Sequence, residues 1–200
     1  ILDIEGAKVV QDHLDKKGIE FILGDSVEQF NQKTAILKSG KKLDFDVLVL
    51  AVGVRPNVSL IKDIGGEVGR GIVIDHKMQT SIQNIYSAGD CTESFDISSD
   101  QNRVLALLPN AYMQGECAGI NMAGGESSFD KAIPMNAIGF FGLRMITAGS
   151  YDGESCAFHN TDSYKKMFIK DNLLKGYILV GKVDKAGIYT SLIREKTPLT

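Results

Sequence analysis

Hydrophobic and polar residues follow two different periods near the start of the chain. From Asp3 to Lys17, apolar residues recur three and four positions apart with charged residues between them, and this spacing predicts an amphipathic helix. Asp3 is suited to cap this helix, and Gly18 follows two lysines, as helix ends prefer. A short apolar run over 19–23 then predicts a strand, so we expect the chain to open with a helix followed by a strand.

The next segments have the pattern of strands. Residues 34–37 and 42–45 flank a Ser-Gly pair and predict a charged hairpin at the edge of a sheet. An unbroken run of β-branched residues and leucines from 46 to 53 predicts a strand buried on both faces, which is typical of a covered parallel sheet. Pro56 then fixes a turn, and we expect the chain to cross there into another domain.

The middle of the chain carries shorter patterns. We expect at most two helical turns over 59–64, and a strand over 72–74 after a glycine-rich loop. Residues 80–90 predict a polar lead-in and a short strand that ends in Ala-Gly-Asp. The polar residues 91–103 predict a surface loop, and the spacing over 110–123 predicts a helix.

The pattern changes after a Gly-Gly-Glu-Ser-Ser linker at 124–128. Short strand-like runs alternate with turns, and Asp171-Asn172 predicts a hairpin turn whose bend includes residues 173–176. We interpret residues 129–200 as a separate α+β domain. Its expected strands are 133–138, 145–148, 164–170 and 177–180, and its closing helix is 184–196.

Composition and charge exclude several classes of function. The net charge of −3 gives no basic surface for nucleic acid or for an anionic membrane. The longest apolar run, Val47 to Val52, is far too short to span a bilayer. No signal-peptide pattern is present, so we expect a cytoplasmic protein. Because the chain begins with Ile1 and not with Met, we expect it to be a piece of a longer protein.

The cysteines and histidines form no recognisable metal or redox motif. Cys91, Cys117 and Cys156 are far apart in sequence and have no zinc spacing, as expected for reduced thiols in a cytosolic protein. Cys91 follows Asp90 directly, so the alternative is that it lies near a ligand. We interpret the three histidines as ordinary surface or core residues and predict no metal site.

Asp90 is the first candidate binding residue. Ala88 and Gly89 keep the surface small before it, so that a ligand can approach the backbone. A carboxylate at the carboxyl end of a strand stands where open α/β sheets place their ligands, and it can accept hydrogen bonds from sugar-like hydroxyl groups. The alternative is a strand followed by an ordinary turn.

The helix over 110–123 carries the second candidate feature. Ala111, Gly115, Gly119 and Ala123 are four residues apart and form one small-residue stripe. Each helical glycine costs about 1 kcal/mol relative to alanine, which favours a close contact on that face. One interpretation is tight packing of the helix on a sheet. The other is that the N-terminus of the helix favours an anionic group.

Three segments together resemble a known family. They are Ala-Val-Gly-Val-Arg-Pro-Asn at 51–57, Gly-Ile-Val-Ile-Asp at 71–75 with Ile-Tyr-Ser-Ala-Gly-Asp at 85–90, and Leu-Pro-Asn-Ala at 108–111 with Gln114-Gly115. In this order the chain resembles the carboxyl-terminal half of FAD-dependent pyridine-nucleotide(-disulfide) oxidoreductases. The resemblance is strongest to NADH:rubredoxin reductases, NADH oxidases and the flavoprotein part of nitrite reductases.

The resemblance implies an α/β fold built from incomplete, doubly wound nucleotide-binding domains. Residues 1–52 would be the carboxyl-terminal part of the NAD(P)-binding domain, and residues 53–128 that of the FAD-binding domain. Residues 129–200 would form the small α+β carboxyl-terminal domain, which serves dimerisation or the acceptor side.

The resemblance also implies roles for five residues, none of them catalytic. Asp90, preceded by Gly89, would bind the ribityl chain of FAD. The backbone at Asn110 and Ala111 would lie near N1 and O2 of the flavin. Gly53 would lie close to the nicotinamide dinucleotide.

The sequence departs from the family because it has no Gly-x-Gly-x-x-Gly opening a helix. Both phosphate-binding loops, and any redox cysteine, would precede Ile1. We therefore expect a parent enzyme that moves electrons from NAD(P)H through FAD to a rubredoxin-like protein, oxygen or a small molecule, with NADH or NADPH left open. We expect this chain alone to retain neither cofactor and to be inactive until it joins the missing amino-terminal part.

Two other interpretations stay open. The chain could be a non-catalytic apo module that forms a homodimer, or a standalone nucleotide-binding regulator. Flavin absorbance that survives gel filtration would contradict the inert module, and calorimetry without NAD or FAD binding would contradict the regulator.

Overall fold

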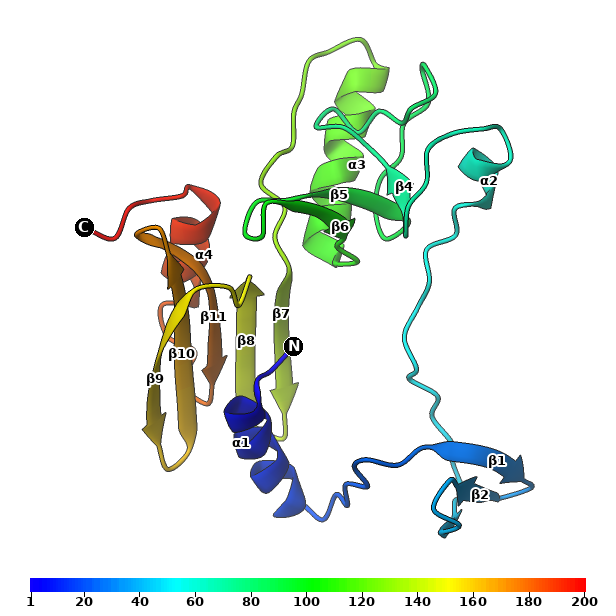
Figure 1. Cartoon of the computed structure of the whole chain (residues 1–200), viewed down its shortest axis with the longest axis vertical. Coiled ribbons are helices and arrows are strands. Elements are labelled where there is room, and N and C mark those ends of the chain that lie inside the picture. The colour runs from blue at the N-terminus through cyan, green and yellow to red at the C-terminus, as the bar shows by residue number, and fades with distance from the viewer.

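Three separate β-sheets follow one another in the computed structural model, which describes all residues from 1 to 200 (Figure 1). The helices are α1 (Ile4–Asp15), α2 (Ser59–Lys62), α3 (Leu108–Met122) and α4 (Ala186–Arg194). The strands are β1 (Val27–Asn31), β2 (Thr34–Leu37), β3 (Lys42–Asp44), β4 (Ile72–Val73), β5 (Thr92–Asp96), β6 (Gln101–Val104), β7 (Met135–Phe140), β8 (Leu143–Gly149), β9 (Glu154–Asn160), β10 (Ser163–Lys170) and β11 (Leu173–Val180).

The first sheet is the antiparallel meander β1-β2-β3. The predicted hairpin is confirmed as β2 and β3, and Gly40 closes its turn with a φ of +86°. This conformation is one that glycine adopts without steric cost. β1 was not predicted, because all five of its residues are exposed and give no apolar alternation.

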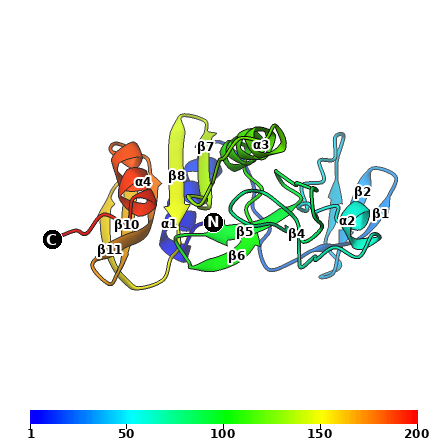
Figure 2. The same cartoon turned by 90° about the horizontal axis from the view of Figure 1, so that it is seen from above.

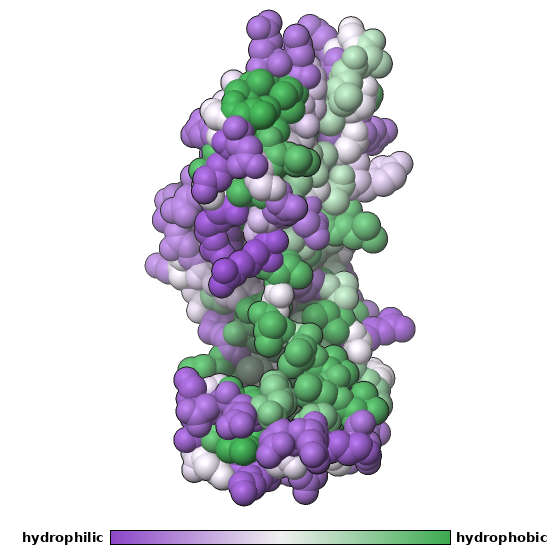
Figure 3. Space-filling view, turned by 90° about the vertical axis from the view of Figure 1, so that its right-hand side faces the viewer, coloured by the Kyte–Doolittle hydropathy of each residue, from purple (hydrophilic) through white to green (hydrophobic).

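The buried strand predicted for 46–53 is wrong for this chain. These residues form no strand, and Val47, Val49 and Val52 are 80%, 79% and 91% exposed. A strand forms only where a neighbour accepts and donates its backbone hydrogen bonds, and no strand of this chain lies beside the segment. The strand predicted for 19–23 is wrong for the same reason. Hydrophobic residues gather on the face of the molecule that lies on the right in Figure 1 and faces the viewer in Figure 3.

The second sheet, β4-β5-β6, has one parallel and one antiparallel pair. The surface loop predicted for 91–103 is wrong, because these residues form the hairpin β5–β6. The buried side chains of β5 are Thr92, Ser94 and Asp96, and their polarity concealed the strand pattern. The strand predicted within 80–90 is also wrong, since only a single bridge joins Gln79 to Tyr86.

The third sheet contains five antiparallel strands in the order β7-β8-β11-β10-β9. It confirms the predicted α+β character of the last part of the chain. Asp171 and Asn172 make the expected hairpin turn, with φ angles of +53° and +59°. Residues 173–176 belong to β11 and not to the bend, which corrects that prediction. β9 was not predicted, because every residue in it is exposed.

Helices cover both faces of this third sheet (Figures 1 and 2). On one face, α4 packs against β8 and β11 with Ile193 in the core. On the other face, α1 packs Val10 and Leu14 against Tyr164 of β10 and Ile178 of β11. The predicted helix over 3–17 is confirmed, and it contacts the carboxyl-terminal sheet although it stands at the other end of the sequence.

The cap predicted for α1 is confirmed. Oδ1 of Asp3 accepts a hydrogen bond from the Gly6 N–H at 2.9 Å. The helix predicted for 110–123 is confirmed as α3, and the closing helix is confirmed as α4. No helix combines the length and the apolar character needed to cross a bilayer.

Candidate functional site

The Ala-Gly-Asp loop and the first turns of α3 lie against each other. The Gly89 N–H donates to Oε1 of Gln114 at 2.7 Å. Gly89 has a φ of +86°, and a Cβ atom added to it would lie 3.6 Å from Cβ of Ala111. The positive φ explains why a glycine precedes Asp90, while the added Cβ would make only an ordinary van der Waals contact with Ala111. The structure therefore brings together three of the predicted residues, Gly89, Asp90 and Ala111.

Gln114 is the residue that holds this arrangement. Its side chain is almost fully buried, and its Oε1 also accepts a hydrogen bond from Oγ1 of Thr92 at 3.1 Å. Its Nε2 donates to Oγ of Ser94 at 3.2 Å. One amide thus joins α3, β5 and the loop before Asp90. Sequence reasoning included Gln114 in a motif without giving it a role. The only available signal was a polar residue on the apolar face of a helix.

Asp90 itself is exposed and accepts no hydrogen bond within the chain. It lines a cleft of about 510 Å³ whose volume lies within the range of small-molecule sites. The other residues that line this cleft are Val54, Pro56, Arg70, Glu93, Gln101, Asn102, Arg103, Val104 and Ala106.

The second carboxylate of the cleft is already engaged. Oε2 of Glu93 accepts hydrogen bonds from the backbone N–H groups of Arg70 at 2.8 Å and Gly71 at 3.1 Å. Arg103 contacts the buried Asp96 at 3.3 Å. Asp90 is therefore the carboxylate of this cleft that is free to bind a hydroxyl group or a cation.

The N-terminus of α3 presents free backbone donors. Ala111 donates its N–H to the Leu107 carbonyl at 2.9 Å, so this group is used within the helix. The N–H groups of Leu108 and Asn110 have no partner, and Pro109 has none to offer. The Asn110 side chain is buried and donates to the Ile133 carbonyl at 3.3 Å. These donors and the helix dipole favour an anion or a carbonyl oxygen at this end.

Gly53 and the two glycines of the small-residue stripe are not part of this arrangement. Gly53 has a φ of +91°, and a Cβ atom added to it would meet nothing within 4 Å, although its neighbour Val54 lines the Asp90 cleft. A Cβ atom added to Gly115 or Gly119 of α3 would likewise meet nothing within 4 Å. The tight packing expected on the stripe is therefore absent within this chain.

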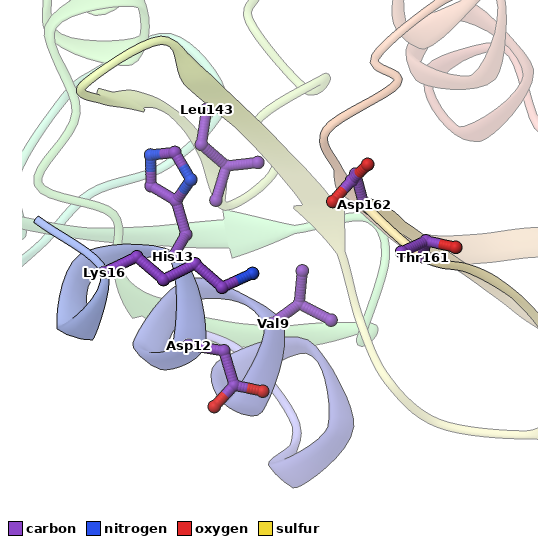
Figure 4. Close-up of a pocket in the computed structure, with 7 residues that line it drawn as sticks. All are labelled: Val9, Asp12, His13, Lys16, Leu143, Thr161 and Asp162. Atoms are coloured by element: carbon purple, nitrogen blue, oxygen red, sulfur yellow. The ribbon is translucent and has the colours of Figure 1, made fainter.

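A smaller hollow lies between α1 and the turns after β7 and β9 (Figure 4). Its volume is about 120 Å³, which is below the size of a typical small-molecule site. Nε2 of His13 lies 3.0 Å from the Phe140 carbonyl at its edge, so the ring holds the β7–β8 turn against α1. We interpret this histidine as structural.

Two family models match the chain. Residues 1–115 match the model of the pyridine nucleotide-disulphide oxidoreductases, and residues 134–197 match that of the rubredoxin NAD+ reductase C-terminal domain. An NADH oxidase of Methanocaldococcus jannaschii is 39% identical over 132 residues, covering 64% of this chain and 30% of the relative. An NADH-rubredoxin oxidoreductase of Clostridium acetobutylicum is 30% identical over 186 residues, covering 91% of this chain and 45% of the relative.

A solved structure has the same architecture. The NAD-dependent persulfide reductase from A. fulgidus superimposes with a TM-score of 0.90 at 25% identity, covering 98% of this chain and 42% of that chain. The chain thus spans less than half the length of these relatives. The predicted α/β fold, with partial nucleotide-binding domains followed by a carboxyl-terminal domain, is confirmed. The chain belongs to the pyridine nucleotide-disulphide oxidoreductase family.

Proposed function

We propose that this chain is the carboxyl-terminal part of a flavoprotein that moves electrons from NAD(P)H through FAD to an acceptor. The observation that carries the proposal is the junction at Gln114. It holds the unpaired Asp90 carboxylate beside the N-terminus of α3. A ligand with hydroxyl groups at one end and electron-rich heteroatoms at the other matches this pair of features.

The residues present fit one side of FAD. Asp90 would accept hydrogen bonds from ribityl hydroxyl groups, and the small residues Gly89 and Ala111 leave room for a ligand between Asp90 and the N-terminus of α3. The free N–H of Asn110 would donate to the pyrimidine edge of the flavin. The bound flavin supplies the redox chemistry, while these residues orient it and favour negative charge at that edge.

We further propose that residues 1–52 and 53–128 are parts of the NAD(P)- and FAD-binding domains. The exposed apolar segment 46–53 supports this division, because it has the composition of a buried strand but no partner here. The sequence also lacks a glycine-rich dinucleotide loop. The chain alone is then a non-catalytic module that retains neither cofactor. A cytoplasmic location is supported by three free cysteines.

The acceptor we propose is a redox protein of the rubredoxin class. The match of residues 134–197 to a rubredoxin NAD+ reductase domain supports it, as does the relative named NADH-rubredoxin oxidoreductase. Oxygen is the alternative acceptor, favoured by the relative named NADH oxidase. Comparing the rates of NADH oxidation by the parent protein with rubredoxin and with oxygen distinguishes the two.

The experiment that tests the flavin site is the Asp90→Ala variant of the parent protein. A hydrogen bond to a charged group contributes about 1.5–3 kcal/mol, so FAD should dissociate roughly 10- to 100-fold more readily. Flavin occupancy after dialysis is the measurement. Asp63→Ala is the matched control, because Asp63 is exposed and lies outside the cleft. Full occupancy in Asp90→Ala would show that this carboxylate does not hold FAD.

A further inference from the structure

A second cleft runs along the end of α4, with the β5–β6 hairpin on one side and strands β7 and β8 on the other. Asp100, at the tip of this hairpin, accepts hydrogen bonds from Lys175 of β11 at 3.2 Å and from Lys196, just after α4, at 3.4 Å. Two adjoining hollows of about 480 and 550 Å³ occupy the cleft, and both are lined by Arg194 and Glu195. Neither hollow shares a residue with the Asp90 cleft.

Arg194 has no partner in this cleft. Its Nε atom is buried without a hydrogen-bond acceptor, and the guanidinium makes no ion pair with any carboxylate. Buried donors are nearly always paired in folded proteins. A guanidinium that offers parallel N–H donors to a cavity matches the two oxygens of a carboxylate.

The neighbouring charges leave Arg194 uncompensated. Glu195 is engaged with Nζ of Lys131 at 2.7 and 2.9 Å. Asp100 is shared between two lysines. Asp130 also lines the cleft, but it is exposed and lies more than 4 Å from the guanidinium. A ligand at Arg194 would therefore supply the missing negative charge.

The larger hollow also has an apolar wall. Met135 and Ala137 of β7 and Ile146 of β8 line it, and Arg194 and Glu195 are its only charged residues. Because β7 is an edge strand, no further strand covers this side. The cleft thus joins one unpaired cation to an apolar surface of a few side chains.

We propose that this cleft binds an organic carboxylate with an aliphatic body. The carboxylate would pair with Arg194, and the body would lie on Met135, Ala137 and Ile146. Inorganic anions lack the body, and neutral alcohols lack the charge, so both should bind more weakly. This site is independent of the flavin proposal, because it uses neither Asp90 nor the N-terminus of α3.

The test follows the Met135 methyl group by NMR in the full 200-residue chain labelled at its methionine methyls. Hexanoate is the probe, hexanol is the uncharged control of equal length, and acetate is the charged control without a body. We expect hexanoate to shift the Met135 signal saturably, and each control to bind at least tenfold more weakly. Equal binding of hexanol, or a non-saturating shift with hexanoate, would overturn the proposal.

Variants of the two unpaired charges sharpen the test. Arg194→Gln should weaken hexanoate binding at least tenfold, and an unchanged affinity would overturn the proposal. Asp130→Asn should strengthen binding, because it removes a nearby charge of the same sign as the probe, and a loss of affinity would contradict binding of the probe as an anion. Lys182→Gln is the control, since this exposed lysine lies outside the cleft.

A third variant distinguishes a loss of hexanoate binding from a loss of folding. Ala137 is exposed, so Ala137→Leu should leave the fold intact while it fills the apolar end of the cleft. We expect this variant to lose hexanoate binding with an unchanged circular dichroism spectrum. Retained binding in folded Ala137→Leu would contradict the placement of the ligand body, whatever the stability of the Arg194 variant.

Discussion

The Tyr164 hydroxyl donates to Oδ2 of Asp3 at 2.6 Å, across 161 positions of sequence. The same hydroxyl lies 3.0 Å from Oε2 of Glu5, and Nζ of Lys166 donates to Asp3 at 2.9 Å. The capping residue of α1 is thereby also the residue that fastens α1 to β10. The first helix and the carboxyl-terminal sheet are joined by a polar contact beside their shared apolar core.

Removing the hydroxyl of Tyr164 should destabilise the chain. Tyr164 is fully buried, and hydrogen bonds to charged groups contribute about 1.5–3 kcal/mol. We expect Tyr164→Phe to lower the free energy of unfolding by about that amount in urea titrations. Tyr112→Phe is the matched control, because Tyr112 is 72% exposed and should change little. Equal stabilities of the two variants would contradict a role for the Tyr164–Asp3 bond.

The contacts of Asp3 predict that the stability of the fold depends on pH. Burial raises the pKa of Asp3, but hydrogen bonds from Lys166, Tyr164 and the Gly6 backbone outweigh it and hold this pKa below its ordinary value. A carboxyl group with a depressed pKa in the folded state stabilises the fold above its unfolded pKa of about 3.9. That stabilisation is lost as the pH falls further, through the lower pKa of the folded state.

Denaturant titrations from neutral pH down to strongly acidic pH measure this dependence. We expect the difference in unfolding free energy between the wild type and Asp3→Asn to be largest near neutral pH. It should shrink below about pH 4, where Asp3 becomes protonated. Asp15→Asn is the control, because Asp15 is exposed and makes no ion pair. A difference that does not vary with pH would rule out titration of Asp3 as the cause.

The apolar side of the same junction gives another prediction. Leu14 is 7% exposed and packs in the core formed by α1 and the third sheet. Leu14→Ala should cost about 2–5 kcal/mol, because it removes buried methyl groups and leaves a cavity. Ile4→Ala, at a residue that is 88% exposed on the same helix, should change stability by less than about 0.5 kcal/mol. Similar losses would show that α1 does not pack as described.

The sequence predicts the elements whose signals are local in the chain, and it fails where an element depends on contacts with distant segments. Helices α1, α3 and α4 were predicted because their residue spacing is a local signal, with an apolar face in α1 and α4 and a row of small residues in α3. The strands expected over 19–23 and 46–53 depend on neighbours that this chain does not provide. Hairpin β5–β6 could not be predicted from hydrophobic alternation, because the buried residues of β5 are the polar Thr92, Ser94 and Asp96.

The same distinction applies to the candidate site. Asp90 was proposed from a short motif, because a carboxylate after Ala-Gly at the end of a predicted strand is a local signal, whereas the role of Asn110 came only from the family resemblance. The role of Gln114 was missed, since its partners Gly89 and Thr92 lie 25 and 22 positions away. Arg194 carried no signal in sequence, because its lack of a partner is visible only when every neighbouring carboxylate is placed.

Gln114 should be essential to the junction between the loop and α3. In Gln114→Ala, the partly buried Gly89 N–H and the Thr92 hydroxyl lose their shared acceptor, which costs about 1–3 kcal/mol of unfolding free energy. We expect lower stability of this chain and lower FAD occupancy of the parent protein. Glu116→Ala is the control, because Glu116 is exposed two positions later in the same helix. Unchanged values in both measurements would show that the amide does not hold the loop.

The exposed segment 46–54 should make this chain self-associate. Val47, Val49 and Val52 are apolar and almost fully exposed, and their backbone groups have no strand partner, which favours pairing between copies. Sedimentation velocity should show oligomers of the wild type at micromolar concentration. The double variant Val47→Lys, Val49→Lys should be mainly monomeric with an unchanged unfolding midpoint, because neither side chain contributes to a core. Replacing the exposed Ile188 of α4 by lysine is the control for a general effect of charge. If Ile188→Lys alone abolished association, the contact would lie on α4 and not on this segment.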